Sequence, residues 1–302
     1  MGGVDELADS TALLADAQAL RGRLAADGYL FFRGLLPADQ VLAAGEAVAA
    51  RLRDGGWTDG RGAPSGPPRA AGAKDALADP AFRAAVSGVA FNQIPYLPPL
   101  RATVRRMLGR QAFSYPAKVL RTVYPERQGR SLGRFMHCDY GVAGVQDMLT
   151  SWVPLMDIPV SLGGLAVRPG GQLRPPALLP RVLSPGQRGW ATTDYRPGDV
   201  IVFHCLTPHA ALPNSTGLLR LSGDFRWQRA EQPAPAEMVL GPGQRRELFS
   251  LLLRWRRWWE PVPAGLTLVP RGQLIAAPPG PSQLFGVHPG WRRYKPPRDA
   301  VH

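Results

Sequence analysis

Apolar residues recur with a helical period in the first third of the chain and in short, strand-like runs after it. The first helix is expected to stop at Asp27-Gly28, because glycine favours the left-handed conformation that ends many helices. Pro37 is well placed to open the second helix. Residues 55–72 are rich in Gly, Pro and Ala and predict a mobile loop, of a length often found in lids. The elements expected here are helices over residues 10–27, 37–54, 78–88 and 98–109 and a buried strand over residues 29–32.

From Ala112 onward the pattern is that of a β protein, with short apolar runs separated by Gly and Pro turns. Strands preceded by helices are typical of a mainly β fold with a helical buttress, and we expect a double-stranded β-helix (jelly-roll, cupin-like) core. The expected strands lie at residues 115–124, around His137, and at residues 147–154, 165–167, 192–199, 200–203 and 219–227.

The chain is long enough for one large core, and residues 1–302 are expected to form a single domain. Within it we expect a mostly helical buttress and lid loop over residues 1–111, the jelly-roll core over 112–230, and a C-terminal helix with a Pro-rich wrap over 231–302. The helix at Gln244–Glu260 is rich in Arg and Trp, which suits a membrane surface or nucleic acid. Docking of its Leu and Trp face on the core is the interpretation we favour.

Composition narrows the class of protein but leaves the meaning of its charge open. No run of about 18 or more apolar residues is present, so no membrane span is expected, and the N-terminus lacks the pattern of a secretory signal. Cys138 and Cys205 make no disulfide framework, which indicates a reduced, cytoplasmic compartment. The net charge of +13 has two interpretations. It is either a consequence of an Arg-rich composition, or a positive field that attracts an anionic substrate or carrier. No nucleic-acid-binding motif accompanies the charge, so no nucleic-acid partner is expected, and the oligomeric state is left open.

The segment Arg134–Tyr140 carries the first chemical signal, because His137 and Asp139 stand two residues apart in an apolar and aromatic run. On a strand this spacing places both side chains on one face. An imidazole and a carboxylate are two of the three groups of a 2-His-1-carboxylate triad, which holds Fe(II) and leaves coordination positions open. The pattern is common by chance, so its interpretation depends on a third ligand downstream.

Two histidines follow the apolar run at residues 200–203, and both are candidates for the third ligand. Either His204 or His209 could instead be a buried structural histidine. Arg220 favours a ligand set, because it lies eleven residues beyond His209 and a hairpin turning at Asn214–Gly217 would place it beside that histidine. Burying an arginine costs free energy unless a carboxylate pairs with its charge. The planar fork of the guanidinium group suits the distal carboxylate of a 2-oxo acid.

Taken in order, these residues resemble the phytanoyl-CoA dioxygenase family of Fe(II)/2-oxoglutarate oxygenases over roughly residues 20–230. Several ordered segments in agreement are a stronger signal than any one motif. The matching segments are His137-Cys138-Asp139, Ser151–Pro159, Gly163–Gly170, Pro197-Gly198-Asp199 with Phe203-His204, and Pro208-His209 with Asn214 and Arg220.

The resemblance implies a role for each matching residue. Fe(II), 2-oxoglutarate and O2 are the implied cofactor and cosubstrates, and Arg220 is the clamp for the distal carboxylate of 2-oxoglutarate. The implied contacts are His137, Asp139 and His209 with Fe(II), and Arg220, Trp152 and Arg121 with 2-oxoglutarate.

Neighbouring positions receive expectations from the same resemblance. His204 is expected to hold a ligand in orientation without touching the metal. On the strand at 115–124, Val119 is expected to face inward together with Arg121, and Lys118 outward. Ala211 stands where some members offer the cosubstrate a hydroxyl, so the clamp rests more heavily on Arg220.

The implied reaction is hydroxylation, or another oxidation, of an unactivated C–H bond in a small molecule of specialised metabolism, with conversion of 2-oxoglutarate to succinate and CO2. Desaturation, epoxidation and ring formation are alternatives that the sequence does not separate. Halogenation is disfavoured, because Asp139 fills the position that related halogenases leave to halide. The alternative function is a catalytically silent jelly roll that binds nucleic acid or an acidic partner through its Arg-rich surface. The complete set of three ligands and Arg220 favours the enzyme.

Basic residues gather between Arg101 and Arg134, and the last of them precedes His137 by three positions. Positive charge at the mouth of a cavity would concentrate an anionic or carrier-linked substrate. A solvated basic face is the alternative interpretation. The residues expected to contact the substrate are Arg127, Arg130, Arg134 and Tyr140.

Overall fold

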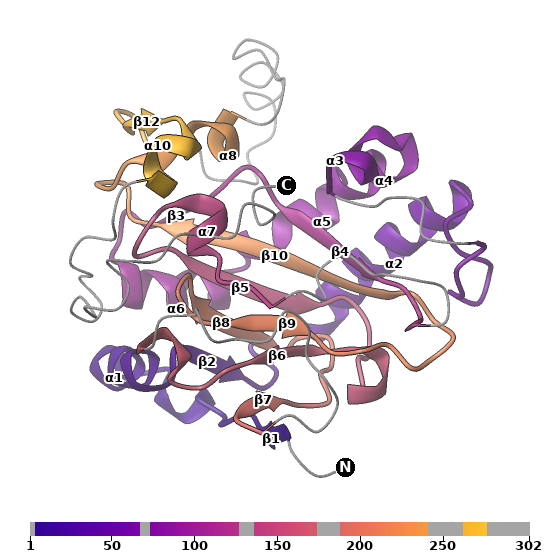
Figure 1. Ribbon diagram of the computed structural model, residues 1–302, viewed down its shortest axis with the longest axis horizontal. Helices are drawn as coiled ribbons and strands as arrows, with labels where there is room; N and C mark the ends of the chain where they lie inside the picture. Colours follow the sequence, from indigo (N-terminus) through magenta and orange to yellow (C-terminus); the bar gives the residue numbers. More distant parts are fainter. Residues whose placement is uncertain (1–3, 67–72, 127–135, 174–187, 241–261, 277–302) are drawn as a thin grey trace.

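A computed structural model describes residues 4–66, 73–126, 136–173, 188–240 and 262–276 (Figure 1). The helix expected at residues 244–260 lies outside this part of the chain. No helix among the described residues is long and apolar enough to cross a membrane. The helices are η1 (Thr11–Leu13), α1 (Ala17–Asp27), α2 (Ala38–Asp54), α3 (Ala73–Ala78), α4 (Pro80–Val86), α5 (Val89–Gln93), η2 (Ile94–Tyr96), α6 (Pro98–Leu108), α7 (Tyr140–Ala143), η4 (Val160–Leu162), η5 (Gly171–Leu173), α8 (Ala236–Leu240) and α10 (Arg271–Ala276).

Most strands belong to two sheets that enclose a common apolar core. The larger sheet has the order β2–β8–β5–β10–β3, with β4 also paired to β10; the smaller has the order β1–β7–β6–β9. In the described residues the sheets do not join into a closed barrel, so the predicted mainly β jelly roll with a helical buttress is confirmed in an open form. The strands are β1 (Val4–Glu6), β2 (Tyr29–Phe32), β3 (Phe113–Ser114), β4 (Val119–Val123), β5 (Leu149–Pro154), β6 (Leu165–Val167), β7 (Trp190–Thr192), β8 (Val200–His204), β9 (His209–Ala211), β10 (Arg220–Gln228), β11 (Ala234–Pro235) and β12 (Leu268–Val269).

Strand β10 lies inside the larger sheet, between β5 on one side and β3 and β4 on the other, and its side chains alternate between two environments (Figure 1). On one face, Leu221, Phe225 and Trp227 pack in a core shared with α1, α2 and α4–α6. On the other face, Asp224 pairs in register with Trp152, which belongs to the core between the sheets. The residues of this inner face are polar and buried: Arg220, Ser222, Asp224, Arg226 and Gln228.

Strand β4 extends the same polar wall. Arg121 and Val119 pair in register with Ser222 and Asp224, so they share the inner face, as expected. Lys118 turns the other way: its ammonium group donates to the Tyr115 carbonyl at 2.9 Å and lies over the Tyr96 ring. Burial lowers the pKa of Lys118 to about 7. The predicted orientations on this strand are therefore confirmed.

Helix α2 lies directly on the end of β5. Val41, Ala44, Val48 and Leu52 make its buried stripe, at the spacing of an amphipathic helix. Gly45 completes that stripe, because a Cβ atom there would stand 2.0 Å from the Leu155 carbonyl oxygen. The helical buttress therefore touches the backbone of the sheet.

The segment at residues 55–66 is better packed than its composition predicts. Trp57 is 2% exposed and belongs to the core under the helices. The Asp59 carboxylate accepts two backbone N–H groups of the following turn, at 2.8 and 2.9 Å. The Gly62 carbonyl accepts the Leu219 N–H at 2.9 Å. Residues 55–66 are therefore packed where the composition predicted a mobile loop, because one aromatic ring supplies packing and one carboxylate supplies turn bonds. Residues 67–72 of the expected lid lie outside the described residues.

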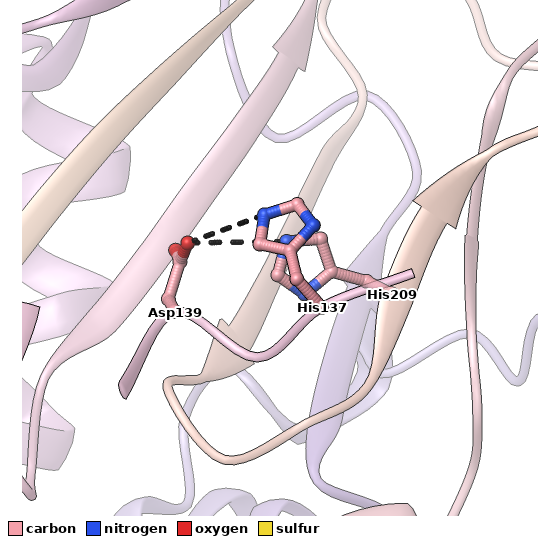
Figure 2. Close-up of side chains that lie close together, drawn as sticks. All are labelled: His137, Asp139 and His209. Atoms are coloured by element: carbon pink, nitrogen blue, oxygen red, sulfur yellow. Dashed lines mark ion pairs between the residues drawn. The ribbon is translucent and has the colours of Figure 1, made fainter. Parts of the chain in front are cut away.

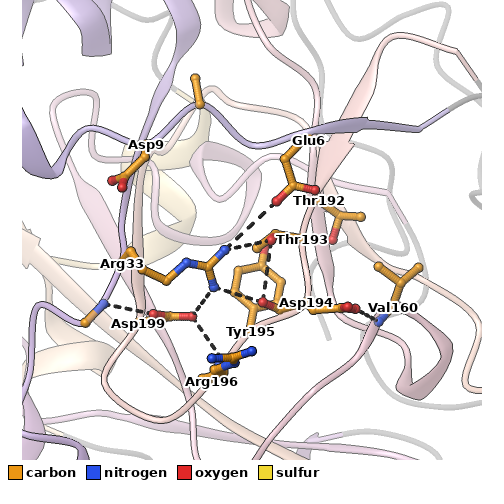
Figure 3. A network of polar contacts seen from close by, with 12 residues as sticks. Glu6, Asp9, Arg33, Val160, Thr192, Thr193, Asp194, Tyr195, Arg196 and Asp199 are labelled. Atoms are coloured by element: carbon orange, nitrogen blue, oxygen red, sulfur yellow. Dashed lines mark hydrogen bonds and ion pairs between the residues drawn. The ribbon is translucent and has the colours of Figure 1, made fainter.

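A network around Asp199 fastens the turn before β8 to the end of β2 (Figure 3). Asp199 is 1% exposed, and both its carboxylate oxygens accept hydrogen bonds. Oδ1 accepts from the Gly34 N–H at 2.9 Å, and Oδ2 accepts from Arg33 Nη1 at 2.7 Å and from the Arg196 N–H at 2.8 Å. Since every one of these partners is a donor from the protein, the network is a structural clamp.

Candidate metal centre

His137, Asp139 and His209 converge between the two sheets (Figure 2). Oδ1 of Asp139 lies 3.7 Å from Nε2 of His137 and 3.9 Å from Nε2 of His209. One donor atom from each residue can be chosen so that all lie within 4.8 Å of one another. Two imidazoles and one carboxylate in this arrangement are the donor set that suits a divalent first-row metal such as Fe(II).

The backbone brings these residues together differently from the prediction. His137 and His209 form an isolated antiparallel bridge, with N–H to carbonyl bonds of 3.1 and 3.0 Å. Two residues later the backbone of Asp139 is helical, with φ −63° and ψ −20°, and it caps α7. The expected strand through Asp139 is therefore wrong: the Tyr140 N–H bonds to the Cys205 carbonyl at 2.8 Å, and the chain turns into α7. This turn, and not strand alternation, directs the carboxylate at the imidazoles.

The Asp139 carboxylate is buried and accepts hydrogen bonds from Arg226 and Thr150. Nη2 of Arg226 donates to Oδ1 at 3.2 Å, and Nε of the same fork donates to Oδ2 at 3.3 Å. The Thr150 hydroxyl also donates to Oδ2, in a short bond. Burial alone would raise the pKa of Asp139, but the Arg226 charge and the two histidines outweigh it and hold the pKa well below its usual range. The group is therefore ionised, as metal binding requires.

The orientation of His209 is set by its own turn. Its Nδ1 lies 3.0 Å from the Thr207 carbonyl, which accepts the Nδ1 hydrogen and leaves a lone pair on Nε2 facing Asp139. Burial is the main cause that lowers the pKa of His209, which favours the neutral ring that binds metals. The arrangement is the one in which a backbone carbonyl fixes the tautomer of a metal-binding histidine.

His204 lies beside this turn and outside the metal cluster. It is fully buried, its Nδ1 accepts the Leu206 N–H at 3.1 Å, and its Nε2 lies 3.8 Å from Asp147. The Thr207 N–H in turn bonds to the His204 carbonyl at 2.8 Å. These contacts connect His204 to the carbonyl that orients His209. The role of His204 in orienting a ligand stays a prediction. The contacts would transmit its position to His209 through Thr207.

Arg220 lies on the inner face of β10, and only part of its guanidinium group is hydrogen-bonded within the described residues. The residue is 2% exposed; Nη1 donates to the Gly163 carbonyl at 2.9 Å, and the guanidinium lies 5.6 Å from the centre of the Trp152 ring. Burial lowers the pKa of Arg220 to about 10. Its Nε is buried and has no hydrogen-bond partner among the described residues. A buried charged donor in this condition is costly, and a carboxylate would satisfy it.

The predicted hairpin between His209 and Arg220 is wrong. Strand β9 pairs with β6 in the smaller sheet, while β10 pairs with β4 and β5 in the larger one. The Asn214 side chain donates to the Val123 and Leu218 carbonyls at 3.0 and 2.8 Å, which holds the connection as it crosses between sheets. His209 and Arg220 therefore belong to opposite walls of the same interior.

Arg121 and Asp224 lie among these groups. Nε of Arg121 donates to Oδ2 of Asp224 at 2.7 Å, and the Arg121 side chain is 22% exposed. After burial, Asp224 and Arg121 are the largest influences on the pKa of Arg220, and both also act on that of His209. This position between metal cluster and clamp is compatible with the expected contact of Arg121 with 2-oxoglutarate, which stays a prediction.

The residues expected to contact the substrate are less well placed by the structure. Tyr140 is 2% exposed and packs in an apolar cluster with Cys138 and Met148. Its contact with a substrate stays a prediction. Arg127, Arg130 and Arg134 lie outside the described residues.

Sequence reasoning missed Arg226, Thr150 and Asp224, although β10 carries a signal for two of them. From residue 220 to 228 the strand alternates polar and apolar or glycine residues, and the polar set includes two arginines and an aspartate. Charges at every second position of a buried strand predict a polar interior wall. Thr150 carries no comparable signal in the sequence.

Residues 24–222 match the sequence profile of the family described as phytanoyl-CoA dioxygenase (PhyH). Over 255 residues the chain is 25% identical to 1-deoxypentalenic acid 11-beta-hydroxylase of Streptomyces exfoliatus, a match that covers 75% of this chain and 86% of that protein. The protein of the same name from Streptomyces arenae is 24% identical over 253 residues, with 74% and 86% covered.

Two solved structures share the fold. The non-heme alpha ketoglutarate dependent epimerase SnoN from nogalamycin biosynthesis has a TM-score of 0.52 and 24% identity, with 72% of this chain and 83% of that chain covered. EctD from S. alaskensis, solved with 2-oxoglutarate and 5-hydroxyectoine, has a TM-score of 0.53 and 17% identity, with 88% and 91% covered. With the family match spanning most of both sheets, the chain belongs to the phytanoyl-CoA dioxygenase family of Fe(II)- and 2-oxoglutarate-dependent oxygenases.

Proposed function

We propose that this dioxygenase hydroxylates a small carboxylic acid of specialised metabolism. In this proposal His137, Asp139 and His209 hold Fe(II), and Arg220 binds the distal carboxylate of 2-oxoglutarate. When bound, Fe(II) with 2-oxoglutarate and O2 supplies the oxidising chemistry, in which 2-oxoglutarate becomes succinate and CO2 and the substrate C–H becomes C–OH.

The observation that carries the proposal is the buried Arg220 Nε, for which the described part of the chain offers no acceptor, on the strand that also anchors Asp139. Arg220 and Arg226 stand on the same face of β10, six residues apart. That separation is roughly 20 Å along an extended strand, and Asp224, which lies between them on the same face, acts on the pKa of both guanidinium groups. One strand therefore supports both ends of a site that binds a metal and a dicarboxylate.

The protein groups have distinct tasks in this site. The inner face of β10 supplies charge and orientation, and Trp152 covers the Arg220 guanidinium, which excludes water from the clamp. His137 is the most exposed of the proposed ligands, with 21% of its side chain accessible against 1% for Asp139. The substrate is therefore expected to approach on the His137 side.

An acidic substrate is supported by charge and by the relatives. The chain carries a net charge of +13, and the inner faces of β4 and β10 hold three arginines, Arg121, Arg220 and Arg226, against one aspartate, Asp224. The Streptomyces relatives are named as hydroxylases of 1-deoxypentalenic acid. A cationic wall raises the local concentration of an anionic substrate. The same reasoning extends to carrier-linked acids.

A silent binding module is the less favoured alternative. Burial of the Arg220 Nε group, which has no acceptor in the described part of the chain, costs free energy. A bound carboxylate would offset that cost, so the arrangement of Arg220 opposite two histidines and a carboxylate favours a ligand-binding enzyme site over a silent module. The discriminating property is turnover.

The test is Fe(II)-dependent succinate release from 2-oxoglutarate, measured with a panel of cyclic and linear carboxylic acids, their methyl esters, and acyl thioesters. Stimulation by an acid and weaker stimulation by its methyl ester would support the proposal. Absence of Fe(II)-dependent succinate in every arm would overturn the enzymatic function, and preference for the neutral ester would overturn the acidic substrate class.

A further inference from the structure

The hydrogen bonds around Asp139 distinguish its two oxygens. Oδ2 accepts from both Thr150 and Arg226 Nε, whereas Oδ1 accepts from Arg226 Nη2 and is the oxygen closest to the two imidazoles. A carboxylate offers about four lone-pair sites, and the protein occupies three of them. The remaining site on Oδ1 is the one that faces the histidines.

The donors that occupy Oδ2 come from a rigid part of the fold. Arg226 and Thr150 are direct partners across β10 and β5, in the middle of the larger sheet. Both are buried, and the side chain of Arg226 is only 5% exposed. Strand register fixes the two donors, so the larger sheet holds the carboxylate in the orientation that the turn at Asp139 gives it.

We propose that Arg226 and Thr150 are positioning residues that restrict Asp139 to ligation through Oδ1 alone. The inference rests on the proposed function. A carboxylate that binds a metal through both oxygens occupies one more coordination position than a carboxylate that binds through one. In a triad enzyme the open positions must serve 2-oxoglutarate and O2 together. Tying Oδ2 to the sheet keeps the position for O2 open when 2-oxoglutarate is bound.

Two substitutions distinguish the orientation of the Asp139 carboxylate from the positive charge near it. Lysine keeps the positive charge near Asp139 but cannot reproduce the planar fork that contacts both oxygens. Valine in place of Thr150 keeps the shape and removes only the hydroxyl donor. A pair away from the metal cluster, Arg33 with Asp199, offers a matched control for the Arg-to-Lys change. The Arg33 guanidinium donates to the Asp199 carboxylate, the Asp194 carbonyl and the Thr193 hydroxyl, and none of these belongs to a proposed ligand.

The experiment uses the full chain, loaded anaerobically with saturating Fe(II) and 2-oxoglutarate and titrated with nitric oxide, a probe of the position that O2 would take. Electron paramagnetic resonance reports nitric oxide binding without any turnover. Arg226→Lys is expected to weaken nitric oxide binding about 10–100-fold in the presence of 2-oxoglutarate, and much less in its absence. Thr150→Val is expected to act in the same direction with a smaller change, and Arg33→Lys to match the wild type.

Wild-type nitric oxide affinity in both Arg226→Lys and Thr150→Val would overturn the inference; if Arg226→Lys fails to fold, Thr150→Val alone decides. Failure of the wild type to bind Fe(II) would instead overturn the proposed function. The two failures are therefore distinguishable in one experiment.

Discussion

Asp139 and Asp199 are each 1% exposed, and each accepts hydrogen bonds from an arginine, but their remaining neighbours differ in kind. Around Asp199 the other neighbours are backbone N–H groups, so donors face acceptors throughout (Figure 3). Around Asp139, Oδ1 faces the Nε2 lone pair of His209, so an acceptor faces an acceptor (Figure 2).

The difference shows how to tell a structural carboxylate from a candidate ligand when burial and charge are the same. A donor shell satisfies the charge and leaves no place for a cation. Acceptors that face one another within a few ångströms repel, and a metal ion removes that repulsion. We therefore predict that changes in the Asp139 cluster alter Fe(II) binding and turnover, whereas changes in the Asp199 network alter the free energy of unfolding.

Removal of a proposed ligand should have the largest effect. His209→Ala and His137→Ala are each expected to abolish Fe(II) binding and succinate formation while circular dichroism stays that of the wild type. His204→Ala is the matched control, since loss of a group that only orients a ligand costs about 10–100-fold in affinity or activity. A dead His204→Ala beside an active His209→Ala would reverse the assignment.

Arg220 should affect the cosubstrate and leave the metal bound. Loss of a buried charge-assisted pair costs roughly 2–5 kcal/mol, so Arg220→Ala should raise the KM for 2-oxoglutarate by about 30-fold or more. Arg220→Lys should recover only part, because a point charge cannot replace the fork. Steady-state kinetics at saturating Fe(II) provide the measurement, and an unchanged KM in Arg220→Ala would remove the clamp from the account.

Asp199→Ala should lower stability and spare chemistry. The change leaves the Gly34 and Arg196 N–H groups and the Arg33 fork without their carboxylate, and we expect a loss of about 2–4 kcal/mol in the free energy of unfolding. Urea unfolding measures the loss, and Fe(II) titration of the folded protein should give the wild-type affinity. Weakened Fe(II) binding with unchanged stability would break the comparison between the two aspartates.

The smallest effect is expected at the edge of the same network. Glu6 lies 4.0 Å from Arg33, with 72% of its side chain exposed. Exposed ion pairs of this kind contribute about 0–1 kcal/mol, so Glu6→Ala should change the midpoint of urea unfolding only slightly. A loss as large as that of Asp199→Ala would show that the clamp extends further than its buried carboxylate.

Local pattern predicted the elements well where one period dominates. The helix ending at Asp27-Gly28 and the buried strand at Tyr29–Phe32 lie where they were expected. These features depend on residues close together in the chain.

Features that depend on distant residues escaped prediction. The segment after His137 read as a strand because its residues are apolar, but the Cys205 carbonyl, 65 positions beyond Tyr140, receives the N–H that starts α7. The assignment of β9 and β10 to different sheets likewise follows from pairing with β6 and β4, not from the turn between them. Trp57 packs in a loop whose composition suggests none of its contacts.

We propose that one interior site binds both Fe(II) and 2-oxoglutarate, through His137, Asp139, His209 and Arg220. Anaerobic addition of 2-oxoglutarate to the Fe(II)-loaded protein, followed by visible absorption, tests it most directly, because chelation of Fe(II) by a 2-oxo acid produces a charge-transfer band. We expect the band to form in the wild type, to require more 2-oxoglutarate in Arg220→Ala, and to be absent in His209→Ala. A band that forms equally in His209→Ala, or no band in a wild type that binds both components, would contradict it.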